Sequence, residues 1–277
     1  MTVEVRSARA AEIAPIVDVL RSSGLGANVG QLLRYPIASP TGDVLVALRN
    51  GQVVGGAAVA GFGATGWIGA VGVAGHARRR GVGRALTEAC VARLRELGAR
   101  TALLFATAAG RPVYERVGFE AEGPVRAWRD AAPPRGAPVG EGVRPLMAAD
   151  VPTVLALDAA ATGEDRSPVL EQMNGALTGL VVERAGRVAG SALRSPWGLG
   201  PSVVAADREA GVALLSVLRR VPGSPLTVSL PDANAGAVRA LRAWGFQPIN
   251  EAVRMRLGPP PAFDPDRVFG MYNLFWG

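Results

Sequence analysis

The chain has 277 residues, enough for one large or two ordinary domains, and its 49% hydrophobic and 19% charged residues are typical of a folded globular protein. A single cysteine and a single histidine exclude a disulfide framework within the chain and a zinc site of the CxxC or HExxH kind, so we expect no metal. All thirty basic residues are arginine, and the net charge is +7. Because this positive charge is scattered along the chain except at Arg78 to Arg84, we expect no nucleic-acid partner.

The first half of the chain predicts helices and strands in a definite order. A first helix opens near Glu12, and a valine-rich hairpin follows, with its turn at 61–66. Although 53–75 holds no charged residue, its glycines favour this buried hairpin over a membrane span. The remaining predicted elements are a strand that ends at Val73, a helix over Gly81–Leu97, a strand over Thr101–Thr107 and a helix that ends at Gly118.

The second half repeats the first. "VRSARAAEIAPIVDVL" from Val5 parallels "VRPLMAADVPTVLALD" from Val143, and "YERVGFEAEG" from Tyr114 parallels "LRAWGFQPIN" from Leu241. A stretch rich in proline and glycine separates the two copies. We therefore predict a first domain over 1–130, a linker over 131–142 and a second domain over 143–277. Each domain is expected to be a mixed α/β (α+β) fold with a mostly antiparallel central sheet flanked by helices.

The stretch "VAGHARRRGVGRAL" (73–86) predicts an anion-binding site. The first N–H groups of a helix have no partner within the helix, and the helix dipole places partial positive charge there. Gly81 and Gly83 would let the main chain approach a bulky anion, although each costs about 1 kcal/mol relative to alanine in a helix. A solvated basic helix start would explain the arginines but not these two glycines. Since the chain has no lysine, a P-loop is excluded.

These residues resemble a known family. Arg78-x-x-Gly81-x-Gly83 after a valine-rich strand is similar to the acetyl-CoA motif (Q/R)xxGx(G/A) of the GCN5-related N-acetyltransferases, the GNAT superfamily. "GRPVYERVGF" (110–119) resembles the family's later segment, in which a tyrosine precedes Gly-Phe by four residues. The resemblance covers about residues 3 to 130. It implies a tandem member whose C-terminal copy is degenerate.

The resemblance also implies residue roles. Val71 and Val73 would bind the pantetheine arm of acetyl-CoA through their main chain. The residues that would hold its pyrophosphate are Arg78, Arg79, Arg80, Gly81, Val82, Gly83 and Arg84. Thr107 takes the place of a common asparagine and could still form a hydrogen bond. Tyr114 would protonate the departing thiolate, since a phenol with a pKa of about 10 keeps its proton until charge develops on sulfur.

No residue stands out as the general base. "GWIGAVGV" in the predicted central strand carries no acidic side chain, and Glu115, Glu120 and Glu122 are close only in sequence. A C-terminal carboxylate is a further hypothesis, because the tail "VFGMYNLFWG" is aromatic and is expected to dock. Turnover that survived added residues after Gly277 would exclude it.

The second copy is expected to have a structural or substrate-facing role. At an offset of 130 residues the acetyl-CoA motif corresponds to "REAGVA" (208–213). There Asp207, Arg208 and Glu209 sum to a charge of −1, whereas the arginines at 78–80 and 84 sum to +4, so a pyrophosphate would be repelled. Leu241 stands where the first copy has Tyr114, and it has no proton to give. We therefore expect catalysis in the first copy alone.

The sequence thus predicts a cytoplasmic acetyltransferase that uses acetyl-CoA as co-substrate. The acetyl group would pass by direct attack in a ternary complex to a primary amine, more readily that of a small molecule than of a protein. We expect no contact with nucleic acid or membrane, and a monomer or homodimer. A CoA-binding or sensing module without turnover is the alternative; it would bind CoA and acetylate no amine in a broad panel.

Overall fold

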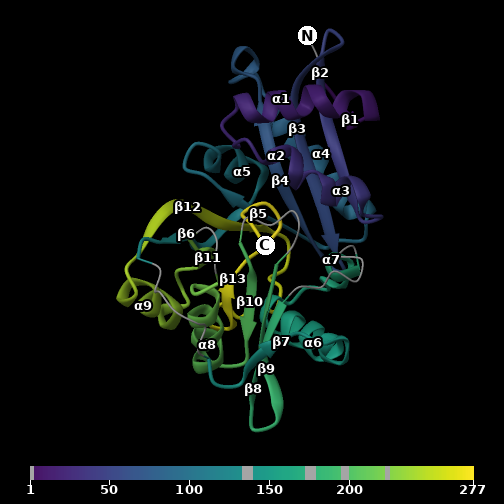
Figure 1. Ribbon diagram of the computed structural model, residues 1–277. Coiled ribbons are helices and arrows are strands. Elements are labelled where there is room, and N and C mark those ends of the chain that lie inside the picture. Colours follow the sequence, from purple (N-terminus) through teal and green to yellow (C-terminus); the bar gives the residue numbers. More distant parts are fainter. Residues whose placement is uncertain (1–2, 133–139, 172–178, 195–199, 222–224) are drawn as a thin grey trace. The chain divides into compact units, whose positions relative to one another are not determined.

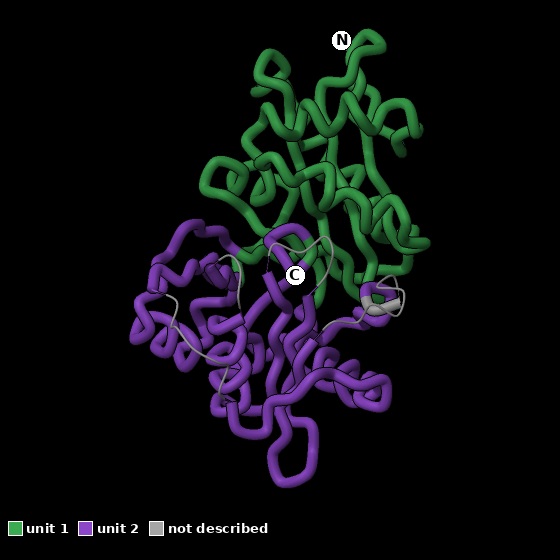
Figure 2. The backbone as a smooth tube through the Cα atoms, viewed as in Figure 1, with its two compact units in different colours: residues 1–122, 254–259, 276 green, residues 123–253, 260–275, 277 purple. Residues whose placement is uncertain are grey.

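The computed structural model describes residues 3–132, 140–171, 179–194, 200–221 and 225–277. The chain forms two compact units (Figure 2). Unit 1 consists of Met1–Glu122, Arg254–Pro259 and Trp276, and unit 2 of Gly123–Val253, Pro260–Phe275 and Gly277. Most of the predicted linker, 133–139, lies outside the described residues. Unit 1 therefore takes part of its chain, Arg254–Pro259, from far along the sequence.

Unit 1 is built around a sheet with the strand order β1-β2-β3-β4-β5-β12-β6 (Figure 1). Its strands are β1 (Glu4–Ser7), β2 (Gly42–Arg49), β3 (Gln52–Phe62), β4 (Thr65–Val73), β5 (Thr101–Ala106), the start of β6 (Glu120–Asp130) and the end of β12 (Phe246–Leu257). Its helices are α1 (Ile13–Ser22), α2 (Val29–Leu32), α3 (Arg34–Ala38), α4 (Val82–Glu96) and α5 (Arg111–Val117). The hairpin expected over 53–75 is confirmed as β3 and β4, which are antiparallel.

The two long helices of unit 1 cover opposite faces of its sheet. Successive strand residues point to opposite faces, and Gly55 and Gly56 of β3 lie side by side in sequence. A Cβ on Gly55 would meet Leu86 of α4, whereas a Cβ on Gly56 would meet Ile16 of α1. These glycines let both helices pack closely on the strand, which gives the predicted sheet flanked by helices.

Unit 2 has the same mixed and mostly antiparallel character. One sheet has the order β13-β10-β9-β8-β7, and β11 pairs with the end of β6. Its strands are β7 (Val143–Pro145), β8 (Gly179–Arg184), β9 (Arg187–Leu193), β10 (Ser202–Ala205), β11 (Thr227–Pro231) and β13 (Val268–Gly270), besides the rest of β6 and β12. Its helices are α6 (Val151–Thr162), α7 (Ser167–Glu171), α8 (Arg208–Leu218) and α9 (Ala235–Ala243). A core that includes Trp128, Leu214 and Phe269 fills this unit.

The same ion pair begins both copies. Arg6 donates two hydrogen bonds to the Glu12 carboxylate, at 2.8 and 2.7 Å, and Arg144 donates two to Asp150, at 2.7 and 2.9 Å. Each carboxylate also accepts a main-chain N–H at the start of its first helix, from Arg9 or from Met147. The repeated pair ties the first strand of each copy to the helix that follows, as expected of a duplicated fold.

These two carboxylates should make the protein sensitive to acid. Hydrogen bonds from their arginines lower the pKa of Glu12 and of Asp150 to about 2. Because each pKa is lower in the folded state, the stabilisation is present above the ordinary carboxylate pKa and is lost as the pH falls toward 2. We expect the difference in Tm between wild type and Glu12→Gln/Asp150→Asn to shrink from about pH 6 to about pH 2. Asp18→Asn, which removes an exposed carboxylate, is the control; a difference independent of pH would contradict the prediction.

Candidate functional site

In unit 1 the neighbouring strands β4 and β5 separate toward their carboxyl ends. They are parallel and pair from Thr65–Ile68 with Thr101–Leu104, but β4 continues to Val73. Ala70 has a φ of 53°, and the β3–β4 register shifts between Gly56 and Ala58, which marks a bulge in β4. The main chain at Val71 and Val73 therefore lies beyond the last β4–β5 pair, at the edge of an opening between two parallel strands.

The loop after β4 leads into an open helix N-terminus. Arg79 and Gly81 have left-handed φ values of 58° and 81°, and Gly81 is the residue that begins α4. No side chain of the described residues caps this end, so the first N–H groups of a fifteen-residue helix carry their partial positive charge without a capping partner. Val82 is 1% exposed and packs in the core, so its side chain does not face a ligand.

Packing does not explain the second glycine of this loop. A Cβ on Gly83 would lie 3.8 Å from Val73 and 4.0 Å from Val113, which are ordinary van der Waals contacts. Alanine would therefore fit and would favour the helix by about 1 kcal/mol. The bare main chain at Gly83 suits the close approach of a ligand.

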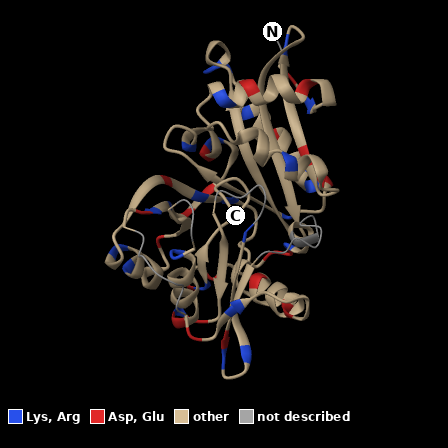
Figure 3. Ribbon diagram, in the orientation of Figure 1, with Lys and Arg blue, Asp and Glu red and all other residues tan. Residues whose placement is uncertain are grey.

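The four arginines of the loop differ in their contacts. Arg78 donates to the carbonyl of Val73 at 3.2 Å, and Arg84 pairs with Glu88 at 2.8 Å. Arg79 and Arg80 are exposed, and neither has an ion pair or side-chain hydrogen bond with any described residue. Figure 3 marks the arginines and the acidic residues along the chain, and outside this loop many arginines form ion pairs, such as Arg6, Arg93 and Arg144. Arg79 and Arg80 are thus the two cations of the loop that remain available to an anion.

Tyr114 lies on α5, which packs against α4. Its ring makes an edge contact with Phe119, with centroids 6.1 Å apart, and a Cβ on Gly110 would lie 3.1 Å from the ring. Among the described residues, none forms a hydrogen bond with its hydroxyl. Burial, with a smaller contribution from the Cys90 thiol, raises the pKa of Tyr114, so the phenol stays protonated at neutral pH. Thr107 accepts the Gly110 N–H at 3.2 Å and so helps to begin α5.

The three glutamates considered as bases all have arginine partners. Glu115 pairs with Arg111 at 2.6 Å on α5. Glu120 accepts from Arg256 at 2.8 Å. Glu122 accepts from Arg254 and, at 3.1 Å, from Arg256. Each of these carboxylates is already engaged by a guanidinium, so the geometry singles out none of them as the base.

Sequence reasoning missed an aromatic and cationic cluster in unit 1. The rings of Trp67 on β4 and Phe105 on β5 lie 4.6 Å apart, and the Arg254 guanidinium lies 5.6 Å from the Trp67 ring. A Cβ on Gly66 would meet Leu94 of α4, so the adjacent Trp67 points to the opposite face of the sheet. The cluster lies where β4 and β5 begin to separate. Nothing in the sequence signals it, because Arg254 comes from the far end of the chain.

The counterpart of the loop in unit 2 has been shortened. The sequence comparison placed it at 208–213, but these residues form the first turns of α8, so that placement is wrong. Only Ala206 and Asp207 separate β10 from α8, whereas 74–81 separate β4 from α4. Asp207 caps α8 by accepting the Ala210 N–H at 2.8 Å, and Leu241 is fully buried. In the described part of unit 2, α8 therefore starts at a capped end and not at an open, basic one like that of α4.

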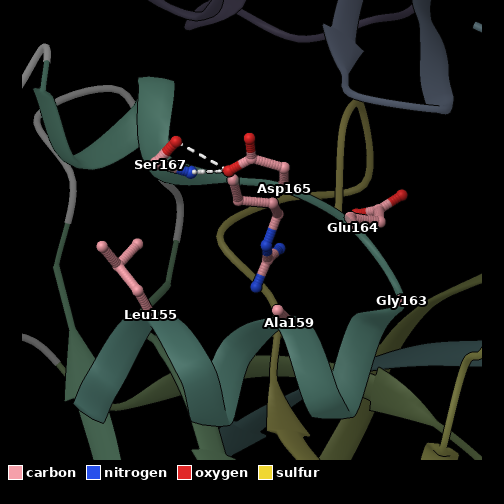
Figure 4. A pocket seen from close by; sticks show the side chains of 7 residues that line it. Leu155, Ala159, Gly163, Glu164, Asp165 and Ser167 are labelled. Carbon is pink, nitrogen blue, oxygen red and sulfur yellow. Dashed lines mark hydrogen bonds between the residues drawn. The ribbon is translucent and has the colours of Figure 1, made fainter. Parts of the chain in front are cut away.

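Unit 2 also contains a pocket of about 450 Å³ beside α6 (Figure 4). Its polar groups mostly bind one another. Ser167 donates from its hydroxyl and its N–H to one Asp165 oxygen, at 2.6 and 3.1 Å, and Arg166 pairs with Asp158. These contacts hold the loop after α6, and they place no group for acyl transfer.

Comparisons with known proteins agree with this architecture. Two family models, both described as acetyltransferase (GNAT) domain, match residues 40–121 and 154–270. The uncharacterised N-acetyltransferase YitH of Bacillus subtilis (strain 168) is 28% identical over 198 residues, which is 69% of either chain.

Solved structures show the same fold over nearly the whole chain. A candidate acetyltransferase from Pyrococcus horikoshii matches 99% of this chain and 96% of its own, with a TM-score of 0.83 and 22% identity. A GCN5-related N-acetyltransferase from Sphaerobacter thermophilus matches 95% of this chain and 98% of its own, with a TM-score of 0.64 and 15% identity.

Among the described residues, no helix is long and apolar enough to cross a membrane.

Proposed function

The chain belongs to the GNAT acetyltransferases, with two domains of this family in tandem, and we propose that its first domain transfers an acetyl group from acetyl-CoA to a primary amine. The observation that carries the proposal is one arrangement within unit 1. Two parallel strands separate beside an uncapped, arginine-rich helix start, and a protonated tyrosine lies on the adjacent helix.

The loop and the strand opening suit the two ends of acetyl-CoA. A pyrophosphate carries about two charges, and the N–H groups of Val82, Gly83 and Arg84 together with Arg79 and Arg80 offer charge-assisted hydrogen bonds, each worth about 1.5–3 kcal/mol. Arg78, which holds the Val73 carbonyl, would shape the loop as much as it binds the ligand. The main chain of Val71 and Val73 would bind the pantetheine arm by hydrogen bonds, in the way that a sheet edge binds an added strand.

The reaction then needs a neutral amine and a proton for sulfur. The amine nitrogen attacks the acetyl carbonyl carbon, the carbon–sulfur bond breaks, and the electron pair leaves with the CoA sulfur. Tyr114 donates its proton to that sulfur as negative charge develops, the proton that the nitrogen loses as the amide forms passes to water, and water reprotonates the Tyr114 phenolate. Holding both substrates together in the right orientation would supply most of the rate acceleration. Thr107 would support Tyr114 indirectly by fixing the start of α5.

Removing the two available arginines tests the cofactor site. We expect Arg79→Ala/Arg80→Ala to raise the Kd for acetyl-CoA about tenfold or more for each arginine, with a weaker salt dependence than wild type. Calorimetric titration measures both the affinity and the number of sites, which we expect to be one per chain. The matched control is Arg95→Ala/Arg100→Ala, two exposed arginines of unit 1 outside the loop, which removes the same charge.

The outcomes of this titration are distinct. Equal weakening in both double variants would mean that net charge alone attracts the ligand, and it would contradict a site at 78–84. Acetyl-CoA binding without acetyl transfer to any amine in a broad panel would favour a sensing module over an enzyme.

A further inference from the structure

In unit 2 a strand from the end of the chain occupies the space between the two strands that correspond to β4 and β5. β13 pairs antiparallel with β10, with Val203 opposite Gly270 and Val204 opposite Val268. On its other side Met271 donates its N–H to the Ser229 carbonyl of β11 at 2.8 Å (Figure 1). In unit 1 the corresponding strands pair directly and then separate.

Side chains hold this strand in place from two sides. The Asn234 amide, 2% exposed, donates to the carbonyls of Asp266 at 3.2 Å and Val268 at 3.0 Å, while its oxygen accepts the Ala237 N–H. The Phe269 ring is fully buried and lies against Gly211 of α8, where an added Cβ would overlap the ring. The strand is therefore fixed by main-chain pairing, one amide and one aromatic ring.

We propose that the cleft of the second domain has changed from cofactor binding to strand binding, and that its ligand is the chain's own segment Asp264–Met271. The comparison with a cofactor cleft rests on the proposed function of unit 1, but the occupancy by β13 does not. The shortened loop and the Asp207 carboxylate at the start of α8 agree with this exchange, because a phosphate would be repelled there. The segment fills the cleft that the lost cofactor would otherwise leave open.

The substitution Gly211→Ala tests this proposal, because the proposal predicts whether Tm rises or falls. It lies within α8, where alanine is ordinarily preferred over glycine, so Gly211→Ala should raise Tm if the cleft is empty in solution. With the Phe269 ring in the cleft, the new methyl group has no space. We then expect Gly211→Ala to lower Tm by roughly 2–4 °C or more and to speed amide exchange over 268–271 at least about tenfold.

A second variant makes the test independent of simple destabilisation. In a Phe269→Ala background the ring is gone, so we expect Gly211→Ala to raise Tm instead of lowering it. Phe246→Ala, which removes a ring of similar burial elsewhere in unit 2, is the control; in that background Gly211→Ala should still lower Tm. All variants are compared as full chains without acetyl-CoA.

A rise in Tm for Gly211→Ala in the wild-type background would overturn the proposal. A change in Tm of the same sign for Gly211→Ala in the wild-type and Phe269→Ala backgrounds would also overturn it. These Tm measurements are made without acetyl-CoA, so they test the strand-binding cleft alone. If the effect of Gly211→Ala on Tm changes sign between the two backgrounds but the protein binds no acetyl-CoA, the function proposed for unit 1 is refuted and the strand-binding cleft is still supported.

Discussion

Tyr114→Phe is expected to lower kcat by about 10²–10⁴ while the Kd for acetyl-CoA stays near the wild-type value. The proposed role of the hydroxyl is confined to the step in which the carbon–sulfur bond breaks, so its loss affects the transition state and not cofactor binding. The ring would remain against Phe119 and Gly110. Since none of the described residues forms a hydrogen bond with the hydroxyl, the variant should keep the wild-type Tm.

The pH profile adds a second readout for Tyr114. Its pKa is raised by burial, so the donating, protonated form persists to a higher pH than for an exposed phenol. We therefore expect no fall in kcat from this group below about pH 10. Tyr272→Phe, which removes a hydroxyl in unit 2, is the control and should leave kcat unchanged. A Tyr114→Phe enzyme with wild-type kcat would exclude the hydroxyl as proton donor.

Local patterns were enough to predict most elements of unit 1. The glycine turn at 61–66 correctly separated two buried strands, and the helix expected over Gly81–Leu97 is α4, Val82–Glu96. These features depend on neighbours a few residues apart, where hydrophobic spacing and turn residues are informative.

Contacts between distant segments could not be predicted in this way. The pairing of β12 with β5 brings Arg254 beside Trp67, and no local pattern reports which strands of a duplicated chain become neighbours. The motif at 208–213 failed for a related reason. The connection before α8 is shorter than the one before α4, so similar letters lie in a helix instead of a loop, and a short motif does not record where its helix begins.

Asp130→Ala is expected to destabilise unit 2 by about 3–5 kcal/mol. Asp130 ends β6 and is 1% exposed, and Arg219 at the end of α8 donates to its two oxygens at 2.9 and 3.2 Å. Arg219 also donates to the carbonyls of Ala132 and Trp244, each at 3.1 Å, and its guanidinium lies over the Trp244 ring. Removing the carboxylate would leave this charge buried without its counter-ion.

The double variant Asp130→Ala/Arg219→Met separates the charge from the contact. Because neither charge then remains buried, we expect it to lose less stability than Asp130→Ala alone, measured by denaturant unfolding. Asp18→Ala is the control: its pair with Arg21 is exposed and 3.7 Å long, so its loss should cost no more than about 0.5 kcal/mol. If Asp130→Ala costs as little as Asp18→Ala, then the guanidinium is solvated in solution and the Arg219 contacts do not hold the end of β6 in place.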